Sequence, residues 1–255
     1  MLRKRAENPA KINKIQGFTL LELLIGMALS LVLINGLMAV FAGTVRGSAD
    51  SLRIAQLSQE MRAVMSVISS EIRRAGYWDA ARNNPTAQVG NINPHGVFRV
   101  FTAAGTQCVL YSYDDVAGGN HFRGFRIRNG AIEWRRSAAA FNNCNGANAQ
   151  WSAITTPVVN ITAFTPSSVN SQCNNLTTGG NCDPCAGGGW VNNDLLVYVR
   201  QIDLILTGNL TIDNQITLTL NDSVRVRNEE IGTAAANYTA AQNPCGGSIR
   251  LRMVL

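Results

Sequence analysis

The chain reads Gly17-Phe18-Thr19-Leu20-Leu21-Glu22 and then continues as an uncharged run from Leu23 to Val45. A lone acid therefore stands at the edge of a long apolar segment. Twenty-three residues of α-helix rise roughly 35 Å, slightly more than the hydrocarbon thickness of a bilayer. The segment is long enough to span a membrane, and it predicts a chain anchored by one helix.

The residues before this segment are basic. Met1 to Gly17 contains five lysines and arginines against the single acid Glu7, so +4 of the formal charge of +6 belongs to these residues. A basic flank holds its end of a membrane segment in the cytoplasm. An ordinary secretory signal has its small-residue cleavage site after the apolar core, whereas Gly17 comes before it. We therefore expect a cytoplasmic leader, and the net charge is poor evidence for nucleic-acid binding.

Beyond Val45 the helical pattern continues and becomes amphipathic, because apolar residues recur every three or four positions. These positions are Ile54, Leu57, Met61, Val64, Ile68 and Ile72. With Gly76 as a stop signal, one helix is expected from Phe18 to about Ala75. Four glycines offer points where it could bend or unwind locally, namely Gly26, Gly36, Gly43 and Gly47.

From Val97 onward the apolar alternation has the period of two that is typical of strands. The expected strands are Val97–Phe101, Cys108–Tyr113, Phe122–Arg128, Ala131–Arg136, Pro157–Phe164, Leu195–Leu206, Asn209–Leu220 and Ser248–Leu255. Together with the helix they predict an α+β fold, in which a long N-terminal helix packs on an antiparallel β-sheet head.

The sharpest local prediction is a hairpin at Asn129-Gly130. A type I′ turn there pairs Ile127 with Ile132, Phe125 with Trp134, and Arg126 with Glu133. The apolar pairs share one face, so this face should cover the core. The other face is expected in solvent, with Arg126, Arg128, Glu133 and Arg135.

The stretch from Gly17 to Glu22 resembles the class III signal of type IV prepilins and type II secretion pseudopilins, in which a glycine precedes an apolar or aromatic residue and a Thr-Leu-x-Glu stretch. The resemblance implies that a prepilin peptidase cuts after Gly17 and that the new first residue, Phe18, is N-methylated. Glycine suits such a site because it readily takes the extended backbone that a protease needs. The alternative is a plain signal anchor in which the motif occurs by chance.

Glu22 needs a reason to lie in a membrane segment. Placing a carboxylate in hydrocarbon costs about 2.5 to 3.5 kcal/mol, whereas a pair of opposite charges about 4 Å apart at an effective dielectric of 20 recovers about 4 kcal/mol. The α-amine of Phe18 in a neighbouring subunit is a suitable partner. We favour a role in subunit assembly for Glu22 over a carboxylate that snorkels to the headgroups.

Six cysteines follow the membrane segment, in the part that topology places outside the cytoplasm, where thiols are oxidised. They are Cys108, Cys144, Cys173, Cys182, Cys185 and Cys245. Fifteen connectivities are possible, and local spacing favours Cys108 with Cys144, and Cys245 with a member of the Cys173, Cys182 and Cys185 cluster. Structural disulfides are favoured over a zinc site or a redox motif at Cys182-Asp183-Pro184-Cys185, which has loop flanks and no nearby histidine.

Catalysis is poorly supported. Only His95 and His121 could act as imidazole bases, and neither lies in a nucleophile or metal motif. We expect both histidines to be loop residues. The sequence therefore predicts no catalytic residue, no metal site and no cofactor. Calcium binding is conceivable at the aspartates, but no EF-hand loop occurs. The candidates are Asp183, Asp194, Asp203, Asp213 and Asp222.

A cluster of arginines beside two aromatic residues could grip DNA. It consists of Arg123, Arg126, Arg128, Arg135 and Arg136, near Phe122 and Trp134. Because the hairpin alternation points the arginines away from the core, we favour a solvated sheet face and do not expect nucleic acid as a partner.

Four later segments narrow the resemblance to the PilW family of type IV minor pilins. They are Arg73–Trp78, Cys108–Asp114, Gly124–Arg135 and Val224–Asn228. The resemblance implies a minor pilin that helps to initiate type IV pilus assembly. A J-type pseudopilin of a type II secretion system is the first alternative, and a membrane-tethered adhesin or DNA-binding surface domain is the second.

The expected organisation follows from these segments. Residues 1–17 form a cleaved leader, 18–45 a transmembrane and assembly helix, 46–75 its amphipathic continuation, and 76–255 a disulfide-stabilised β-rich head. By resemblance the chain lies in the bacterial inner membrane with a periplasmic head and then in a pilus at the cell surface. Its implied partners are prepilin peptidase, other minor and major pilins, the inner-membrane assembly machinery and a tip adhesin.

Overall fold

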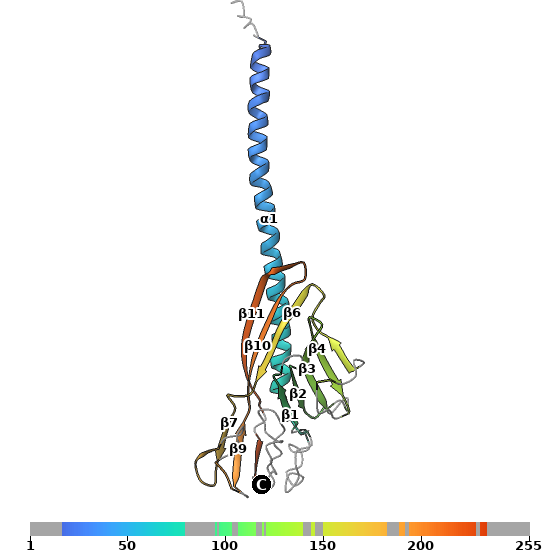
Figure 1. The fold of residues 1–255 in the computed structure, drawn as a ribbon, viewed down its shortest axis with the longest axis vertical. Helices are drawn as coiled ribbons and strands as arrows, with labels where there is room; N and C mark the ends of the chain where they lie inside the picture. Colours follow the sequence, from blue (N-terminus) through green and yellow to red (C-terminus); the bar gives the residue numbers. More distant parts are fainter. Residues whose placement is uncertain are drawn as a thin grey trace, which may run out of the picture. The chain divides into compact units, whose positions relative to one another are not determined.

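The structure is a computed structural model that describes residues 17–79, 95, 97–103, 107–115, 119, 121–139, 144–145, 150–182, 189–191, 194–227 and 230–233. The chain divides into two compact units, Met1–Leu52 and Arg53–Leu255. One uninterrupted helix of 54 residues, α1 (Leu20–Arg73), belongs to both. The expected α+β class, a long N-terminal helix with antiparallel sheets, is confirmed (Figure 1).

The first unit consists of the N-terminal part of α1. Every described residue from Gly17 to Ser48 is exposed, and the most apolar window of the helix has a mean hydropathy of 2.4. The helix is long and apolar enough to cross a membrane. The four glycines of this stretch do not unwind it, because α-helix continues through all of them.

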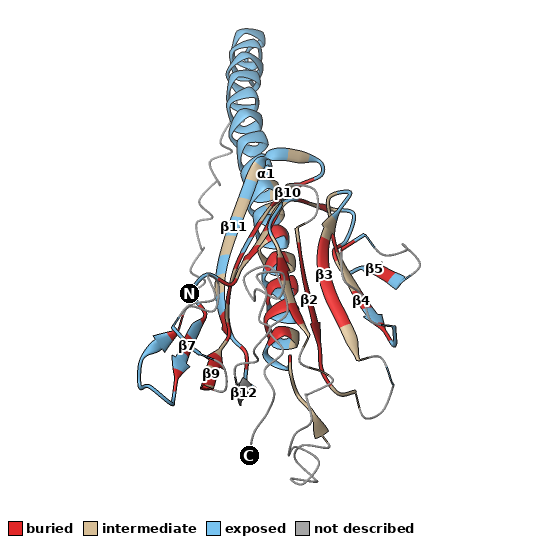
Figure 2. Ribbon diagram, turned by 60° about the horizontal axis from the view of Figure 1, so that its bottom comes forward, coloured by how far each residue is buried: buried red, intermediate tan, exposed pale blue. Residues whose placement is uncertain are grey.

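The second unit begins where α1 acquires a buried stripe (Figure 2). Its buried members are Leu57, Met61, Val64, Met65, Ile68, Ser69 and Ile72. Ile54, which the periodicity placed in this stripe, is 52% exposed. The stripe therefore begins one turn later than expected. At the other end Gly76 has a φ of 77°, a conformation that favours glycine, and it ends the helical region as predicted.

The described strands form three antiparallel sheets. Sheet A has the order β1-β2-β3-β4-β5, sheet B the order β11-β10-β6, and sheet C the order β12-β9-β7-β8. The strands of sheet A are β1 (Phe98–Phe101), β2 (Cys108–Ser112), β3 (Phe122–Arg128), β4 (Ala131–Ser137) and β5 (Trp151–Ala153). Sheet B contains β6 (Val159–Ser167), β10 (Gln201–Leu210) and β11 (Asp213–Arg225). Sheet C contains β7 (Gln172–Asn175), β8 (Asn181–Cys182), β9 (Leu195–Val199) and β12 (Glu230–Thr233).

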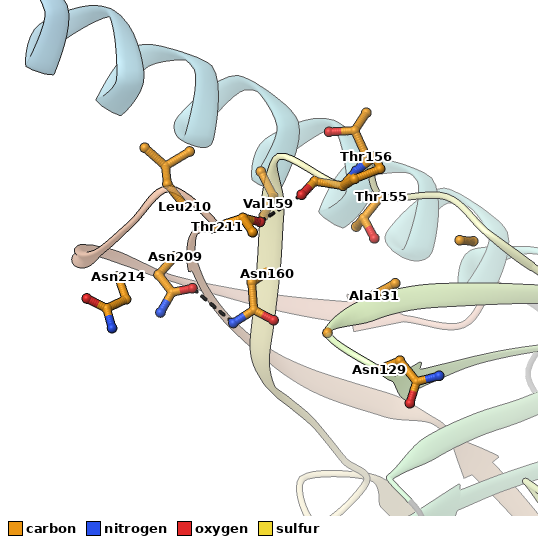
Figure 3. Close-up of a pocket in the computed structure, with 13 residues that line it drawn as sticks. Asn129, Ala131, Thr155, Thr156, Val159, Asn160, Asn209, Leu210, Thr211 and Asn214 are labelled. Atoms are coloured by element: carbon orange, nitrogen blue, oxygen red, sulfur yellow. Dashed lines mark hydrogen bonds between the residues drawn. The ribbon is translucent and has the colours of Figure 1, made fainter.

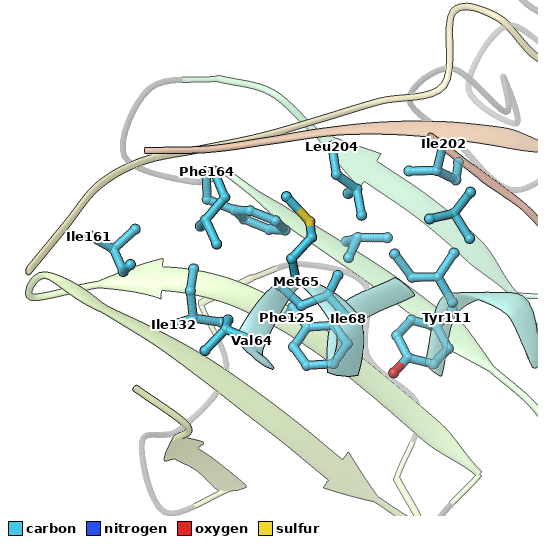
Figure 4. Close-up of a cluster of buried hydrophobic side chains, with 14 of the residues drawn as sticks. Val64, Met65, Ile68, Tyr111, Phe125, Ile132, Ile161, Phe164, Ile202 and Leu204 are labelled. Carbon is cyan, nitrogen blue, oxygen red and sulfur yellow. The ribbon is translucent and has the colours of Figure 1, made fainter. Parts of the chain in front are cut away.

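The main core joins the buried stripe of α1 to sheets A and B. Figure 4 shows side chains of α1 lying between side chains of the two sheets. The labelled residues are Val64, Met65 and Ile68 of α1, Tyr111, Phe125 and Ile132 of sheet A, and Ile161, Phe164, Ile202 and Leu204 of sheet B. Each sheet thus contributes one apolar face to the same helix, which explains why a single stripe organises both.

The predicted hairpin is confirmed in register. Ile127 pairs with Ile132, and Asn129 and Gly130 have φ angles of 49° and 74°, the positive values that a type I′ turn requires. Phe125 and Ile132 are fully buried in the core, and Ile127 and Trp134 pack against it.

The opposite face of this hairpin is not the solvated surface that alternation predicted. Arg126 and Arg135 are 4% and 3% exposed, and only Arg128 and Arg136 among the expected solvent-facing arginines are exposed. A second layer covers this face, because Trp151 of β5 packs there with the Cys108–Cys144 disulfide. Alternation identified the two faces correctly but could not show that a distant segment covers the outer one.

Two expected strands near residue 200 have different ends. The run Leu195–Leu206 divides into β9 and β10 at Arg200, and β10 continues to Leu210 instead of turning at Gly208. A Cβ atom at Gly208 would lie 3.0 Å from the Met61 sulfur and 3.2 Å from the Asn160 carbonyl oxygen. Gly208 therefore permits close packing of β10 on α1. The expected strand Ser248–Leu255 lies outside the described residues.

We predict that Gly124→Ala destabilises the head by about 1–3 kcal/mol, because a methyl group there would lie 2.8 Å from the Val109 carbonyl oxygen and 2.6 Å from Leu110. Thermal unfolding of the full chain in detergent, followed by tryptophan fluorescence, measures the change. The control is Gly180→Ala, whose Cβ position has no neighbour closer than 3.8 Å. Equal melting temperatures for the two variants would contradict the prediction.

Candidate functional site

The segment predicted for processing and assembly lies at the start of α1. Gly17 and Phe18 precede the helix, and Glu22 lies in its first turn. The Thr19 hydroxyl accepts a hydrogen bond from the Glu22 N–H at 3.2 Å, and the Glu22 carboxylate accepts from the Thr19 N–H at 3.4 Å and its hydroxyl at 3.3 Å. This reciprocal arrangement is a capping box. The spacing Thr19-x-x-Glu22 is its sequence signal, which alone would have predicted the start of the helix.

The capping box places the carboxylate where it helps the helix. The first four backbone N–H groups at a helix start lack partners within the helix, and a negative charge there also interacts favourably with the helix dipole. Glu22 therefore contributes to the start of α1, which is separate from the role in assembly that the sequence predicts for it. Both bonds from Thr19 end on the same carboxylate oxygen, Glu22 Oε2.

Polar side chains within the apolar stretch are satisfied by the helix itself. Ser30, Asn35 and Thr44 donate to backbone carbonyls three or four residues earlier, at 2.9, 2.8 and 3.0 Å. Such bonds lower the cost of placing a hydroxyl or an amide in hydrocarbon. The three residues are therefore compatible with a membrane environment.

In the head, the last turns of α1 meet sheet A through a buried charge network. Glu71 accepts hydrogen bonds from the Tyr113 hydroxyl at 2.9 Å, the Tyr111 hydroxyl at 3.4 Å and Arg123 Nη1 at 3.5 Å. The Arg123 and Glu71 side chains are only 5% and 13% exposed. Removing one partner of such a pair typically costs about 3–5 kcal/mol, because the other charge stays buried.

Arg123 connects this network to a second carboxylate. Its Nη2 lies 2.7 Å from the Asp115 carboxylate, and its guanidinium lies 4.2 Å from the centre of the Tyr113 ring. The Arg74 guanidinium lies 4.3 Å from the same ring centre. The two cations make favourable contacts with the aromatic ring. Burial and the neighbouring Glu71 raise the pKa of Tyr111 and of Tyr113 well above the usual value for tyrosine.

Three of the segments that carry the narrower resemblance meet at this junction. The end of α1 and the residues that follow it form backbone hydrogen bonds with the end of β2 and with the residues after β11. Three hydrogen bonds join them: Gly76 N–H to Ser112 O at 2.8 Å, Asp114 N–H to Tyr77 O at 2.8 Å, and Arg227 N–H to Arg73 O at 3.1 Å. The segments therefore share a structural task, which is to fix the end of α1 on the sheets.

On the outer face of the hairpin, Arg126 has a complete set of contacts. Its Nε lies 2.6 Å from the Glu133 carboxylate, its Nη1 donates to the Cys144 carbonyl at 2.8 Å, and its guanidinium lies 4.3 Å from the Trp151 ring centre. Burial, followed by the nearby charge of Arg126, lowers the pKa of Arg135. Arg123, Arg126 and Arg135 are therefore buried in the head. Of the arginine cluster considered for DNA binding, only Arg128 and Arg136 are exposed.

Two disulfides occur among the described residues. Cys108 bonds to Cys144 across 36 residues, the pair that spacing favoured, and Cys173 bonds to Cys182 across 9 residues. Neither Cys173 nor Cys182 is therefore the partner of Cys245, and Cys182 is not paired with Cys185 as the disfavoured redox motif would require. Cys185 and Cys245 lie outside the described residues. On loop entropy the two bonds stabilise the head by about 4 and about 2.5 kcal/mol.

The aspartates considered for calcium are engaged separately. Asp194 accepts from Asn175 Nδ2 at 2.6 Å and from the Val191 N–H at 2.8 Å, and Asp213 accepts from the Gln215 N–H at 3.1 Å. These are local bonds that shape turns and strand ends. Asp183 lies outside the described residues.

One pocket of about 580 Å³ opens beside the hairpin turn (Figure 3). It is lined by Asn129, Gly130, Ala131, Ala153, Thr155, Thr156, Pro157, Val159, Asn160, Asn209, Leu210, Thr211 and Asn214. The Asn160 amide donates to the Asn209 side-chain oxygen at 3.1 Å. None of these lining residues has an ionisable side chain, so the pocket offers amides and hydroxyls but no acid or base of its own.

A membrane-length helix that begins at a capped Thr-Leu-Leu-Glu motif, together with an antiparallel β-sheet head, fits the class of type IV pilin-like proteins. Residues 12–34 match the prokaryotic N-terminal methylation motif. Residues 50–226 match the family described as prepilin peptidase-dependent protein B, and the chain belongs to this family. No curated protein and no solved structure matches the chain.

The raised pKa values of Tyr111 and Tyr113 predict alkaline destabilisation. Up to about pH 10 both tyrosines are neutral in the folded and unfolded states, so their contribution is complete. Above about pH 10 only the unfolded chain ionises readily, and each tyrosine lowers the free energy of unfolding by about 1.4 kcal/mol per pH unit. Chemical denaturation at a series of pH values measures this slope. It should be shallower in Tyr111→Phe/Tyr113→Phe, and an unchanged slope would contradict the assignment.

Proposed function

We propose that this chain is a minor pilin, a structural subunit without enzymatic activity that is cleaved after Gly17, is N-methylated at Phe18 and helps to initiate assembly of a type IV pilus. The observation that carries the proposal is the combination of the methylation motif at residues 12–34 with one exposed apolar helix that begins inside it. The expected organisation into leader, transmembrane helix, amphipathic continuation and β-rich head is part of the same proposal.

The described geometry supports an anchoring role for the N-terminal helix. Its apolar side chains are exposed on all sides, and its polar side chains bond to its own backbone. A helix of this composition is stable in lipid or among similar helices but not in water. We propose that it lies first in the inner membrane, with the head in the periplasm, and later among the helices of other pilins in a filament.

The narrower assignment to the PilW family rests on the segments that fix the end of α1 to the sheets. They lie within or at the edge of the region that matches prepilin peptidase-dependent protein B. A J-type pseudopilin of a type II secretion system would share the leader and helix. Deletion of the gene distinguishes the two, since loss of surface pili and twitching motility supports the minor pilin, whereas loss of secreted enzymes supports the pseudopilin.

The processing step has a direct test. Mass spectrometry of the protein from sheared filaments should find a chain that begins at Phe18 and carries one added methyl group. Gly17→Val should retain the leader, because a β-branched side chain obstructs the extended backbone needed for cleavage. The control is Gly36→Val, which changes a glycine within the helix and should be processed normally. Cleavage of both variants at the same rate would overturn the assigned site.

The assembly role of Glu22 predicts a separate defect. Glu22→Ala should be cleaved and inserted into the membrane, yet its amount in sheared filaments should fall by roughly tenfold or more. A charge pair at an effective dielectric of 20 contributes about 4 kcal/mol, and a third of this corresponds to about tenfold in an equilibrium. Leu21→Ala is the matched control. Normal incorporation of Glu22→Ala would show that the carboxylate serves only the helix start.

A further inference from the structure

The only two histidines of the chain converge on one aspartate. His95 and His121 are 26 positions apart in the sequence, but the centres of their rings are 4.6 Å apart. The Asp114 Oδ1 atom lies 3.9 Å from His95 Nε2 and 3.6 Å from His121 Nδ1. Nothing in the spacing of the two histidines indicates a shared partner, so the sequence alone predicts two separate loop residues.

Backbone contacts hold this group in place. Asp114 Oδ2 accepts the Asp79 N–H at 3.2 Å, which leaves Oδ1 toward the imidazoles. The Tyr113 N–H donates to the His121 carbonyl oxygen at 3.1 Å, and this bond fixes the approach to β3 beside the end of β2. A carboxylate with one oxygen bonded in this way is oriented as metal-ligating carboxylates usually are.

The tautomer of His121 places two acceptor atoms opposite each other, its own Nδ1 and the Asp114 carboxylate oxygen. The Asp115 N–H donates to His121 Nδ1 at 3.1 Å, so this nitrogen acts as an acceptor and carries a lone pair. The same nitrogen faces the Asp114 carboxylate oxygen at 3.6 Å, and neither atom supplies a proton to the other. A cation placed between them would convert a repulsive contact into an attractive one.

We infer that His95, Asp114 and His121 form a binding site for a divalent transition-metal ion of the zinc type. Two imidazoles and one carboxylate are a usual ligand set for Zn²⁺, with water completing the coordination. At bond lengths of about 2.0–2.2 Å, tetrahedral ligand atoms lie about 3.4 Å apart. The three ligand atoms here all lie within 4.8 Å of one another, so small side-chain movements would close the site, with the ion replacing the Asp115 bond to Nδ1.

Such an ion would act as a structural clip. It would join His95 to the end of β2 and to the residue that precedes β3, next to the network of Glu71 and Arg123. Asp115 links the two clusters, since its carboxylate binds Arg123 and its neighbour Asp114 supplies the metal ligand. The inference is independent of the pilus assignment, because it concerns only the head.

The test uses the full chain in detergent, purified without a histidine tag and stripped of metal with a chelator. Calorimetric titration with zinc chloride should show one Zn²⁺ per chain and a rise in melting temperature. Binding should be lost in His95→Gln, His121→Gln and Asp114→Asn, and it should persist in the control Asp213→Asn, which changes a carboxylate on β11. Absence of binding to the native chain, or equal binding by the histidine variants, would overturn the site.

A spectroscopic measurement covers the case in which a ligand variant does not fold. Co²⁺ added to the native chain in place of Zn²⁺ should give the visible absorption of a four-coordinate nitrogen and oxygen site. Zn²⁺ should then displace it stoichiometrically. A spectrum with thiolate-to-metal bands would place the ion at cysteines and would contradict the assignment.

Discussion

The burial of one stripe of α1 is the constraint on which the head depends. Sheets A and B both place their apolar faces on Leu57–Ile72, and each large side chain buried there contributes about 1.5–3 kcal/mol. The same helix is apolar on all sides in its N-terminal part. Its sequence therefore changes from an all-round apolar pattern to a stripe within one continuous element, at the point where the chain's own sheets begin to cover it.

The sequence predicted the features that depend only on neighbouring residues, namely the hairpin register and the helix. The hairpin register followed from Asn129-Gly130 because only a few residue pairs tolerate two positive φ angles. The helix followed from its period, although Ile54 is exposed and Met65 joins the stripe. Those two errors have one cause: the period gives the direction of a side chain, whereas its burial depends on where a distant sheet begins.

Longer-range features could not be predicted in this way. Arg126 and Arg135 occupy positions that alternation assigns to solvent, and they are buried because Trp151 and the Cys108–Cys144 disulfide cover them. Gly208 resembles a turn residue in sequence, yet it permits close contact with Met61 inside a strand. In each case the deciding neighbour lies far away in the chain. The capping box was different, because its signal was fully local and was missed.

The capping box also bears on how a subunit would join a filament. In the isolated chain Glu22 Oε2 is already bonded to Thr19, so under the proposed assembly role an α-amine that approaches this oxygen would compete with hydrogen bonds that each contribute about 0.5–1.5 kcal/mol net. A charge pair of about 4 kcal/mol at an effective dielectric of 20 exceeds either of them. If the assembly role proposed for Glu22 holds, the cap would keep the carboxylate hydrogen-bonded until a cationic partner replaces the bonds from Thr19. Under the proposed function, one acid would then serve both the helix start and assembly without a second charged residue in the span.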